Sequence, residues 1–227
     1  MSEGFTGFPK QGVDWFRALQ LSQRREWYQE NKKAFELLWQ EPMKALIPEL
    51  KAPLQKVFGK KLGDEKIFRI FRDIRFSKDK SPFKTWYGAL LPFAGFKDPM
   101  ESPAALYFHL GLEETVAFGF YFLETPKVKR LRAAVLDDKT GGELVKLLAT
   151  AKKAGLEVGA MESLKRPPPG VDPSHPRVEL LKLKGLALTT KGIPKSVRFK
   201  ASFKDWLVEQ AAAAAPVLAW GFKQRLA

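Results

Sequence analysis

The stretch LYFHLGLEETVAFGFYF, residues 106–122, decides the fold. Apolar residues alternate on both sides of the short connector GLEET, which is typical of two antiparallel strands joined as a hairpin. Leu106, Phe108 and Leu110 would share one face of the first strand, because successive side chains of a strand point to opposite faces. The sequence therefore predicts an antiparallel sheet in the middle of the chain.

Helical patterns precede and follow this hairpin. Apolar residues recur at helical spacing before it, and further helices with short strands follow it. A strand-like segment at 67–71 and another at 185–190 add to the sheet. This order predicts an α+β fold, in which N-terminal and C-terminal helices cover a mostly antiparallel sheet. The single predicted domain, 1–227, consists of a helical part (about 11–56), a strand-rich middle (about 66–123) and a helical part with short strands (about 125–227).

Several helix ends can be predicted from capping residues. Ser22 is suited to cap the second helix. Thr140 and Glu143 fit a capping box that begins a helix ending near Gly155. Pro216 is expected to break or kink the last helix, since proline has no N–H for the helical ladder.

The composition indicates a soluble, strongly basic protein. The chain has 227 residues and a formal net charge of +14, which favours nucleic acid or phosphorylated metabolites as partners, or simply colloidal repulsion. It contains no cysteine, which excludes disulfides, thiolate nucleophiles and cysteine-built metal sites. The N-terminus lacks the pattern of a signal peptide, and no run reaches the roughly 20 apolar residues of a membrane span. We therefore expect a cytoplasmic protein without a membrane segment.

The segment FRIFRDIRFSKDKSPFKTW, residues 68–86, is the strongest candidate for a functional site. It combines interleaved aromatic rings with two acids, Asp73 and Asp79. Its six basic residues are Arg69, Arg72, Arg75, Lys78, Lys80 and Lys84. Such a segment is either a solvated rim, in which the acids neutralise their neighbours, or a site that grips an anion.

The chemistry of these side chains suits phosphate. An arginine guanidinium matches a phosphate or carboxylate in two-point geometry, and lysine adds a mobile point charge. The turn SKDKSP at 77–82 would present Ser77 and backbone N–H groups beside the lysines. Asp73 is the candidate catalytic residue, as a proton acceptor or as the group that orients a neighbouring arginine.

Standard catalytic motifs are missing from the chain. There is no glycine-rich Walker loop and no GxGxxG fingerprint. The two histidines, His109 and His175, lie far apart in sequence, and no HExxH or other histidine-based spacing indicates a metal site. A magnesium ion held by oxygen ligands stays open, since carboxylates need no recognisable spacing. We interpret His109 as a hydrogen-bonded residue on the sheet surface.

Two further segments supply candidate ligand-binding residues. The helix around Trp27 carries Arg25 and Asn31, which would border a site if this helix packs near the basic turn. The proline-rich loop KRPPPGVDPSHP at 165–176 carries Arg166 and His175, and loops of this kind are often functional.

These motifs together resemble a bacterial family known as domain of unknown function 2461. The resemblance rests on the order REWYQENK, KIFRIFRDIRFSKDKSPFKT, YFHL, KRPPPGVDPSHP and LLKLKGLAL, and it extends from Phe8 to about Leu207. It implies a single-domain protein of about this length and no activity that can be carried over. Phe83 stands where tyrosine is common in the family, so this chain has no phenolic hydroxyl there.

The matching positions cover the candidates named above. They are Arg69, Arg72, Asp73, Arg75, Phe76, Ser77, Lys78, Lys80, Pro82 and Lys84, then Arg25, Glu26, Trp27, Asn31 and Lys32, and finally Arg166, Pro168, Gly170 and His175.

The leading hypothesis is a basic pocket that binds an anionic, phosphate-bearing small molecule, with or without catalysis. One alternative is a nucleic-acid-binding protein, which the positive net charge favours. The other is a non-catalytic module whose basic segment binds an acidic protein. These patterns identify no cofactor, substrate, reaction or oligomeric state.

Overall fold

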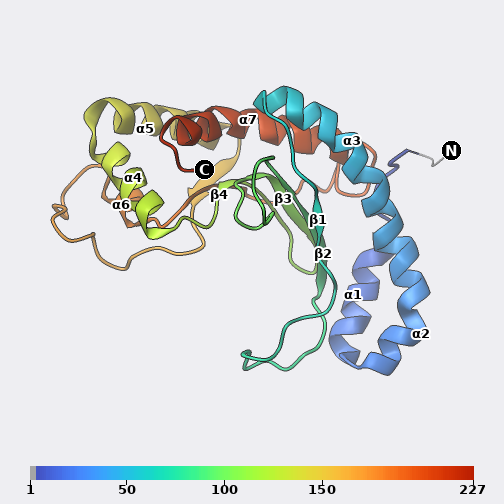
Figure 1. Ribbon diagram of the computed structural model, residues 1–227. Helices are drawn as coiled ribbons and strands as arrows, with labels where there is room; N and C mark the ends of the chain where they lie inside the picture. The colour runs from blue at the N-terminus through green and yellow to red at the C-terminus, as the bar shows by residue number, and fades with distance from the viewer. Residues whose placement is uncertain (1–3) are drawn as a thin grey trace.

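The computed structural model describes residues 4–227 and contains a six-stranded sheet flanked by helices (Figure 1). The first part of the chain forms α1 (Gln11–Ser22), α2 (Arg25–Phe35), the widened π-helical turn η1 (Glu36–Gln40) and α3 (Glu41–Phe58). The middle forms β1 (Lys66–Ile67), β2 (Trp86–Pro92), β3 (Ala104–Gly111) and β4 (Thr115–Phe120). The last part forms α4 (Thr125–Leu136), α5 (Asp138–Lys153), β5 (Leu156–Gly159), α6 (Val178–Lys182), β6 (Leu186–Thr190) and α7 (Phe203–Lys223).

The six strands are antiparallel throughout and lie in the order β1-β2-β3-β4-β6-β5. β3 and β4 form the predicted hairpin, in which Phe108 pairs with Val116 and Tyr107 with Ala117. The α+β prediction is confirmed: the antiparallel sheet lies mid-chain, and helices from both ends accompany it. The limits of the single domain stay a prediction.

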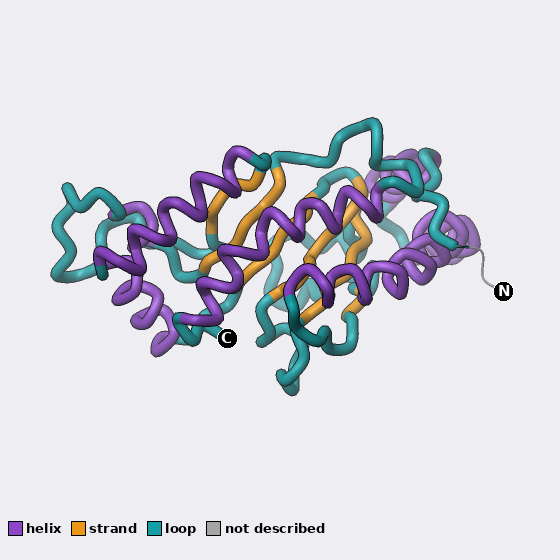
Figure 2. The backbone as a smooth tube through the Cα atoms, turned by 90° about the horizontal axis from the view of Figure 1, so that it is seen from above, coloured by secondary structure: helices purple, strands orange, loops and turns teal. Residues whose placement is uncertain are grey.

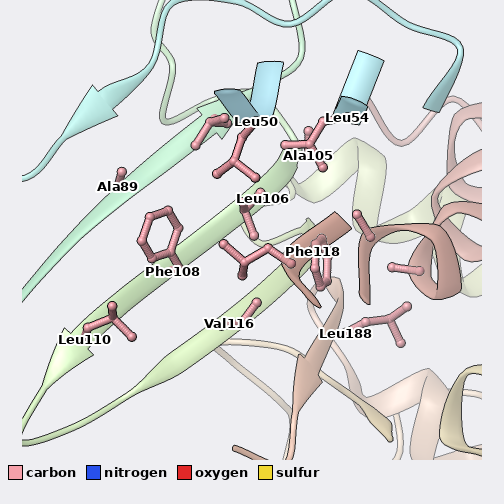
Figure 3. Close-up of a cluster of buried hydrophobic side chains, with 14 of the residues drawn as sticks. Leu50, Leu54, Ala89, Ala105, Leu106, Phe108, Leu110, Val116, Phe118 and Leu188 are labelled. Carbon is pink, nitrogen blue, oxygen red and sulfur yellow. The ribbon is translucent and has the colours of Figure 1, made fainter. Parts of the chain in front are cut away.

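Helices cover one face of the sheet. α3, α5 and α7 lie above it in Figure 1, and Figure 2 shows helices crossing over the strands. Figure 3 shows Phe108 of β3 and Phe118 of β4 gathered on this face with Leu50 and Leu54 of α3, and all four are fully buried. Full burial of such a side chain contributes roughly 1.5–3 kcal/mol, so the alternating pattern selects the face that receives the helices.

The opposite face of the sheet is bordered by loops in Figure 1. Tyr107 and His109 of β3 lie on this face because they alternate with Leu106 and Phe108. We call it the open face. It is only partly covered, since Tyr107 and His109 keep some exposure while their neighbours in β3 are buried.

Prolines lie inside the helices without ending them. α7 continues through Pro216 to Lys223, so the predicted break at this proline is wrong. Ala214 and Val217 pack into the core on both sides of the proline, and this packing outweighs the missing hydrogen bond. The widened turn η1 directly precedes Pro42, where the proline ring would crowd the carbonyl four residues earlier in a regular helix. Within residues 4–227, no helix is long and apolar enough to cross a membrane.

Two predicted helix starts need correction. Ser22 ends α1, and α2 begins at Arg25 without a side-chain cap. The helix predicted from Thr140 and Glu143 begins earlier, because Asp137 is its N-cap and accepts a hydrogen bond from the Thr140 backbone N–H at 2.8 Å. An aspartate caps a helix at least as well as threonine, so the upstream residue sets the boundary.

Two strands also differ from the prediction. The predicted strand 67–71 is shorter: β1 is Lys66–Ile67, the Phe68 N–H adds one hydrogen bond to the Gly88 carbonyl of β2 at 2.9 Å, and the chain then leaves the sheet to form the basic loop. The edge strand β5 (Leu156–Gly159) was not predicted from the sequence. Its middle residues are exposed, so it lacks the regular apolar alternation that marks a half-buried strand.

Candidate functional site

The basic segment forms a long loop between β1 and β2 (Figure 1). Residues 70–72 and 82–84, which we call the neck, pair with each other as in a hairpin and close the loop. The backbone N–H of Arg72 donates to the Pro82 carbonyl at 2.9 Å, and that of Lys84 donates to the Ile70 carbonyl at 2.8 Å. Phe71 and Phe83 form an isolated antiparallel bridge between them. We call residues 68–85 the basic loop.

Aromatic packing anchors the neck to the N-terminal helices. Phe83 is 1% exposed and packs against Tyr28 of α2 and Phe71, with ring centroids 4.9 and 5.2 Å away. The side chain of Gln23 brackets the backbone of Phe83: its amide oxygen accepts from the Phe83 N–H at 3.1 Å, and its amide nitrogen donates to the Phe83 carbonyl at 3.4 Å. The neck therefore holds the basic side chains that follow it at a defined place.

Asp73 is paired with Arg75. The Arg75 guanidinium donates from Nε to Asp73 Oδ1 at 3.0 Å and from Nη2 to Oδ2 at 2.7 Å, and the Arg75 backbone N–H adds a third bond. These contacts with Arg75 lower the pKa of Asp73 to about 2. A carboxylate with so low a pKa is a weak proton acceptor at neutral pH, so the geometry suits its predicted role as an orienting group better.

Asp79 is paired with Arg72. It forms an ion pair with the Arg72 guanidinium and accepts a hydrogen bond from the Ser81 backbone N–H at 2.9 Å. Hydrogen bonds from Ser81, followed by the contact with Arg72, hold the pKa of Asp79 well below its usual range. Arg72 also donates to Ser77 Oγ at 3.4 Å, so the loop folds back on itself around this guanidinium.

Lys84 has a different environment from the other lysines of the loop. Its Nζ donates to the Arg69 carbonyl at 2.9 Å and lies 4.7 Å from the centroid of Trp86 and 5.5 Å from that of Phe68. Burial lowers the pKa of Lys84, and the positive charge of Arg69 lowers that pKa further. Within residues 4–227, neither Lys84 nor Arg69 forms an ion pair with a carboxylate.

A hollow of about 540 Å³ opens between the basic loop, the end of α1 and the β3–β4 connector. We call it the polar hollow. Its charged lining is mixed, because Arg72 and Lys84 face it together with Asp73, Asp79 and Glu113. Its other lining residues are Gln20, Gln23, Ser81, Phe83, Thr85 and Trp86.

Three basic residues of the loop point elsewhere. Lys80 Nζ donates to the Ile74 carbonyl at 3.0 Å and so closes the loop tip. Arg75 is held by Asp73, and Lys78 is exposed. These three side chains, with Arg69 and Ser77, are not part of the lining of the polar hollow.

The predicted residues of α2 do not line the hollow. Asn31 is engaged within the helical layer: its side chain donates to the Trp27 carbonyl at 2.9 Å, and its own carbonyl accepts from Trp15 Nε1 at 3.2 Å. Arg25 is exposed at the start of α2. The residue of this motif that supports the site is Tyr28, through its contact with the neck.

The proline-rich loop lies apart from the basic loop. It runs beside α4 and α6 at the other end of the molecule in Figure 1, and the two loops are separate in Figure 2 as well. His175 Nδ1 accepts from the Arg177 N–H at 3.1 Å, and Arg177 in turn binds Asp138 at 2.8 Å. Arg166 is exposed. The structure therefore does not join Arg166 and His175 to the polar hollow, and ligand binding by them stays a prediction.

Sequence reasoning missed the residues that complete the hollow. Gln20, Gln23 and Glu113 come from α1 and from the hairpin connector, and no local motif marks them. His109 lies on the open face as predicted, where the Tyr107 hydroxyl is 2.9 Å from its Nδ1. Within residues 4–227, no cluster of three or more histidine, aspartate or glutamate side chains could hold a metal ion.

Comparison with known proteins gives one match. A family model described as "Conserved hypothetical protein (DUF2461)" matches residues 11–220. No curated protein and no solved structure matches the chain.

Proposed function

Since the chain belongs to the conserved hypothetical protein family DUF2461, we propose a function from its own side chains: it binds a small, phosphate-bearing anion in the polar hollow. The observation that carries the proposal is Lys84, a half-buried cation beside Arg69 with no carboxylate partner within residues 4–227. An anion at Lys84 Nζ would supply the missing partner, because an opposite charge within about 4–6 Å favours the charged form of a lysine.

The surroundings of Lys84 favour this occupant. Its ammonium group lies over the rings of Trp86 and Phe68, which fixes the position of the charge. One of its three N–H donors is used by the Arg69 carbonyl. The remaining donors can therefore bind an oxyanion without a rearrangement of the side chain.

Arg72 offers a second contact, because it lines the same hollow. Its partner Asp79 is exposed, and exposed ion pairs contribute only about 0–1 kcal/mol. A phosphate can replace Asp79 at low cost, since the guanidinium fork matches two phosphate oxygens. Asp73 would then serve to keep Arg75 folded against the loop, away from the ligand.

The three acids on the lining limit the kind of anion. Asp73, Asp79 and Glu113 would repel a long polyanion that lay across the hollow, whereas a single phosphate group needs only the two cations of the lining, Lys84 and Arg72. This favours a small molecule over nucleic acid. Nucleic-acid binding and docking of an acidic protein elsewhere on the chain stay predictions, as does catalysis.

Titration calorimetry with inorganic phosphate, pyrophosphate and a set of sugar phosphates tests the proposal. Lys84→Met keeps an unbranched apolar stem and removes the charge, and we expect it to weaken binding roughly ten- to a hundredfold, the equivalent of a hydrogen bond to a charged group. Lys78→Met is the matched control, because it makes the same change at an exposed lysine outside the lining. Its expected effect is less than about twofold.

Two results would contradict the proposal. One is a wild-type protein that shows no saturable binding of any of these compounds at millimolar concentration. The other is an equal loss in Lys78→Met and Lys84→Met, which would point to diffuse attraction by the net charge. A steep loss of oligonucleotide binding with salt, without phosphate binding, would favour the nucleic-acid alternative.

A further inference from the structure

A second hollow lies on the open face of the sheet and is separate in character from the polar hollow. It has a volume of about 310 Å³, at the lower end of the roughly 300–1,000 Å³ typical of small-molecule sites. Ala117 of β4 and Tyr107 of β3 line it from the sheet, and Phe68, Met100 and Met161 line it from the loops. We call it the sheet-face cavity.

The cavity is apolar with few polar groups. The hydroxyl of Tyr121 is buried and makes no hydrogen bond to any residue of 4–227. Tyr107 also lines the cavity, and its hydroxyl is 2.9 Å from Nδ1 of His109, which lies outside the lining. A buried polar group without a partner costs about 1–3 kcal/mol, so the Tyr121 hydroxyl indicates a missing hydrogen-bonding occupant.

The titratable groups around the cavity are uncharged near neutral pH. Burial raises the pKa of Tyr107 to about 12 and raises that of Tyr121 above its ordinary value. Burial lowers the pKa of His109 to about 4, and the ring of Trp86 covers this histidine at a centroid distance of 4.6 Å. A charged ligand would find no counter-ion here, whereas a neutral one needs none.

The rim of the cavity consists of flexible and aromatic side chains. Phe122 and Met161 are 56% and 64% exposed, which leaves apolar surface available to a ligand. Methionine adapts its shape to an occupant, and its sulfur makes favourable contacts with aromatic rings. A third hollow, of about 500 Å³, shares Met100, Tyr121, Phe122 and Met161 with the cavity and extends from it toward the start of α4.

We propose that the sheet-face cavity binds a neutral, flat aromatic molecule whose hydroxyl or carbonyl group bonds to the Tyr121 hydroxyl. The ring system would lie over Ala117 between the aromatic and methionine side chains. This site is independent of the proposed phosphate site, because it uses different side chains and an uncharged ligand.

Fluorine NMR with 6-fluoro-2-naphthol as the probe tests this assignment. We expect saturable line broadening with the wild-type protein, and weaker binding of 2-fluoronaphthalene, which lacks the hydroxyl. Tyr121→Phe removes one oxygen and should abolish the difference between the two probes while it retains binding of the hydrocarbon. Ala117→Leu fills the floor of the cavity and should weaken both probes at least tenfold.

Phe76→Ala is the control variant, since Phe76 is 95% exposed and lies outside the cavity lining. Both probes should bind it as they bind the wild type. The assignment is overturned if neither probe binds the wild type at ~1 mM, a concentration at which weak fragments bind. It is also overturned if Tyr121→Phe preserves the preference for the probe with the hydroxyl. A wild-type dimer that Phe122→Asp dissociates would also overturn it, because a second copy would then cover the open face.

Discussion

Phe83→Ala should destabilise the protein by about 3–4 kcal/mol and release the basic loop from α2. An aromatic side chain buries roughly 150–250 Å². Its full burial contributes roughly 1.5–3 kcal/mol, and the cavity left by truncation raises the loss for Phe→Ala to about 3–5 kcal/mol. Phe83 is 1% exposed, so its truncation to alanine removes nearly all of this stabilisation. Phe71 lies beside it with 39% exposure and can partly fill the space, which places the expected loss at the lower end of the range for buried phenylalanines.

Urea unfolding followed by circular dichroism measures this loss, and Phe76→Ala is the control. Phe76 belongs to the same loop but is 95% exposed, so its truncation should change the free energy of unfolding by less than about 0.5 kcal/mol. Phosphate affinity should also fall in Phe83→Ala, because the neck positions Lys84. A loss below about 1 kcal/mol for Phe83→Ala, or equal losses in the two variants, would refute the role of the neck.

Two further predictions concern close packing and pH. Gly221→Ala should lower the free energy of unfolding by about 1–3 kcal/mol, because a Cβ there would overlap the Phe120 ring. The control, Gly142→Ala in α5, places a Cβ that meets nothing within 4 Å and should be neutral or stabilising. Equal unfolding midpoints for the two variants would contradict this. Since the folded pKa of His109 is about 4, the unfolded chain binds more protons between that pH and the ordinary value of 6.5, and stability should fall as the pH is lowered through this window. The expected loss is about 3 kcal/mol, and His109→Gln should remove it. Identical pH profiles of the free energy of unfolding in the wild type and the variant would exclude this origin.

Local sequence patterns predicted the type of most elements because their burial is periodic. In the β3–β4 hairpin, large apolar residues alternate with small or polar ones, and the face with the large residues receives α3 and α7. β5 was not predicted, because most of this edge strand is exposed and its sequence therefore shows no apolar alternation. The break predicted at Pro216 is wrong for a related reason, since the helix propensity of a single residue is weak beside the packing of α7 around it, and the alternative of a kink stays a prediction.

The candidate site was predicted in part. Its charged residues stand together in sequence, so the basic loop was visible as a segment. The sequence could not say that Asp73 and Asp79 each take one arginine, which leaves Lys84 and Arg69 without an acidic partner within residues 4–227. That outcome depends on how the loop folds back, and loop conformation is not periodic.

Residue order alone is enough to identify the family, the α+β class and the basic loop, because each of them follows from patterns over short distances. Only the tertiary structure decided which residues meet. It brought Gln23 of the α1–α2 connection and Glu113 of the hairpin connector to the basic loop, and it left the proline-rich loop at the other end of the molecule. It also left the open face of the sheet without helices, so that Tyr107 and Tyr121 line a cavity. These contacts join residues distant in the chain, and they are set by the packing of whole elements that no local pattern records.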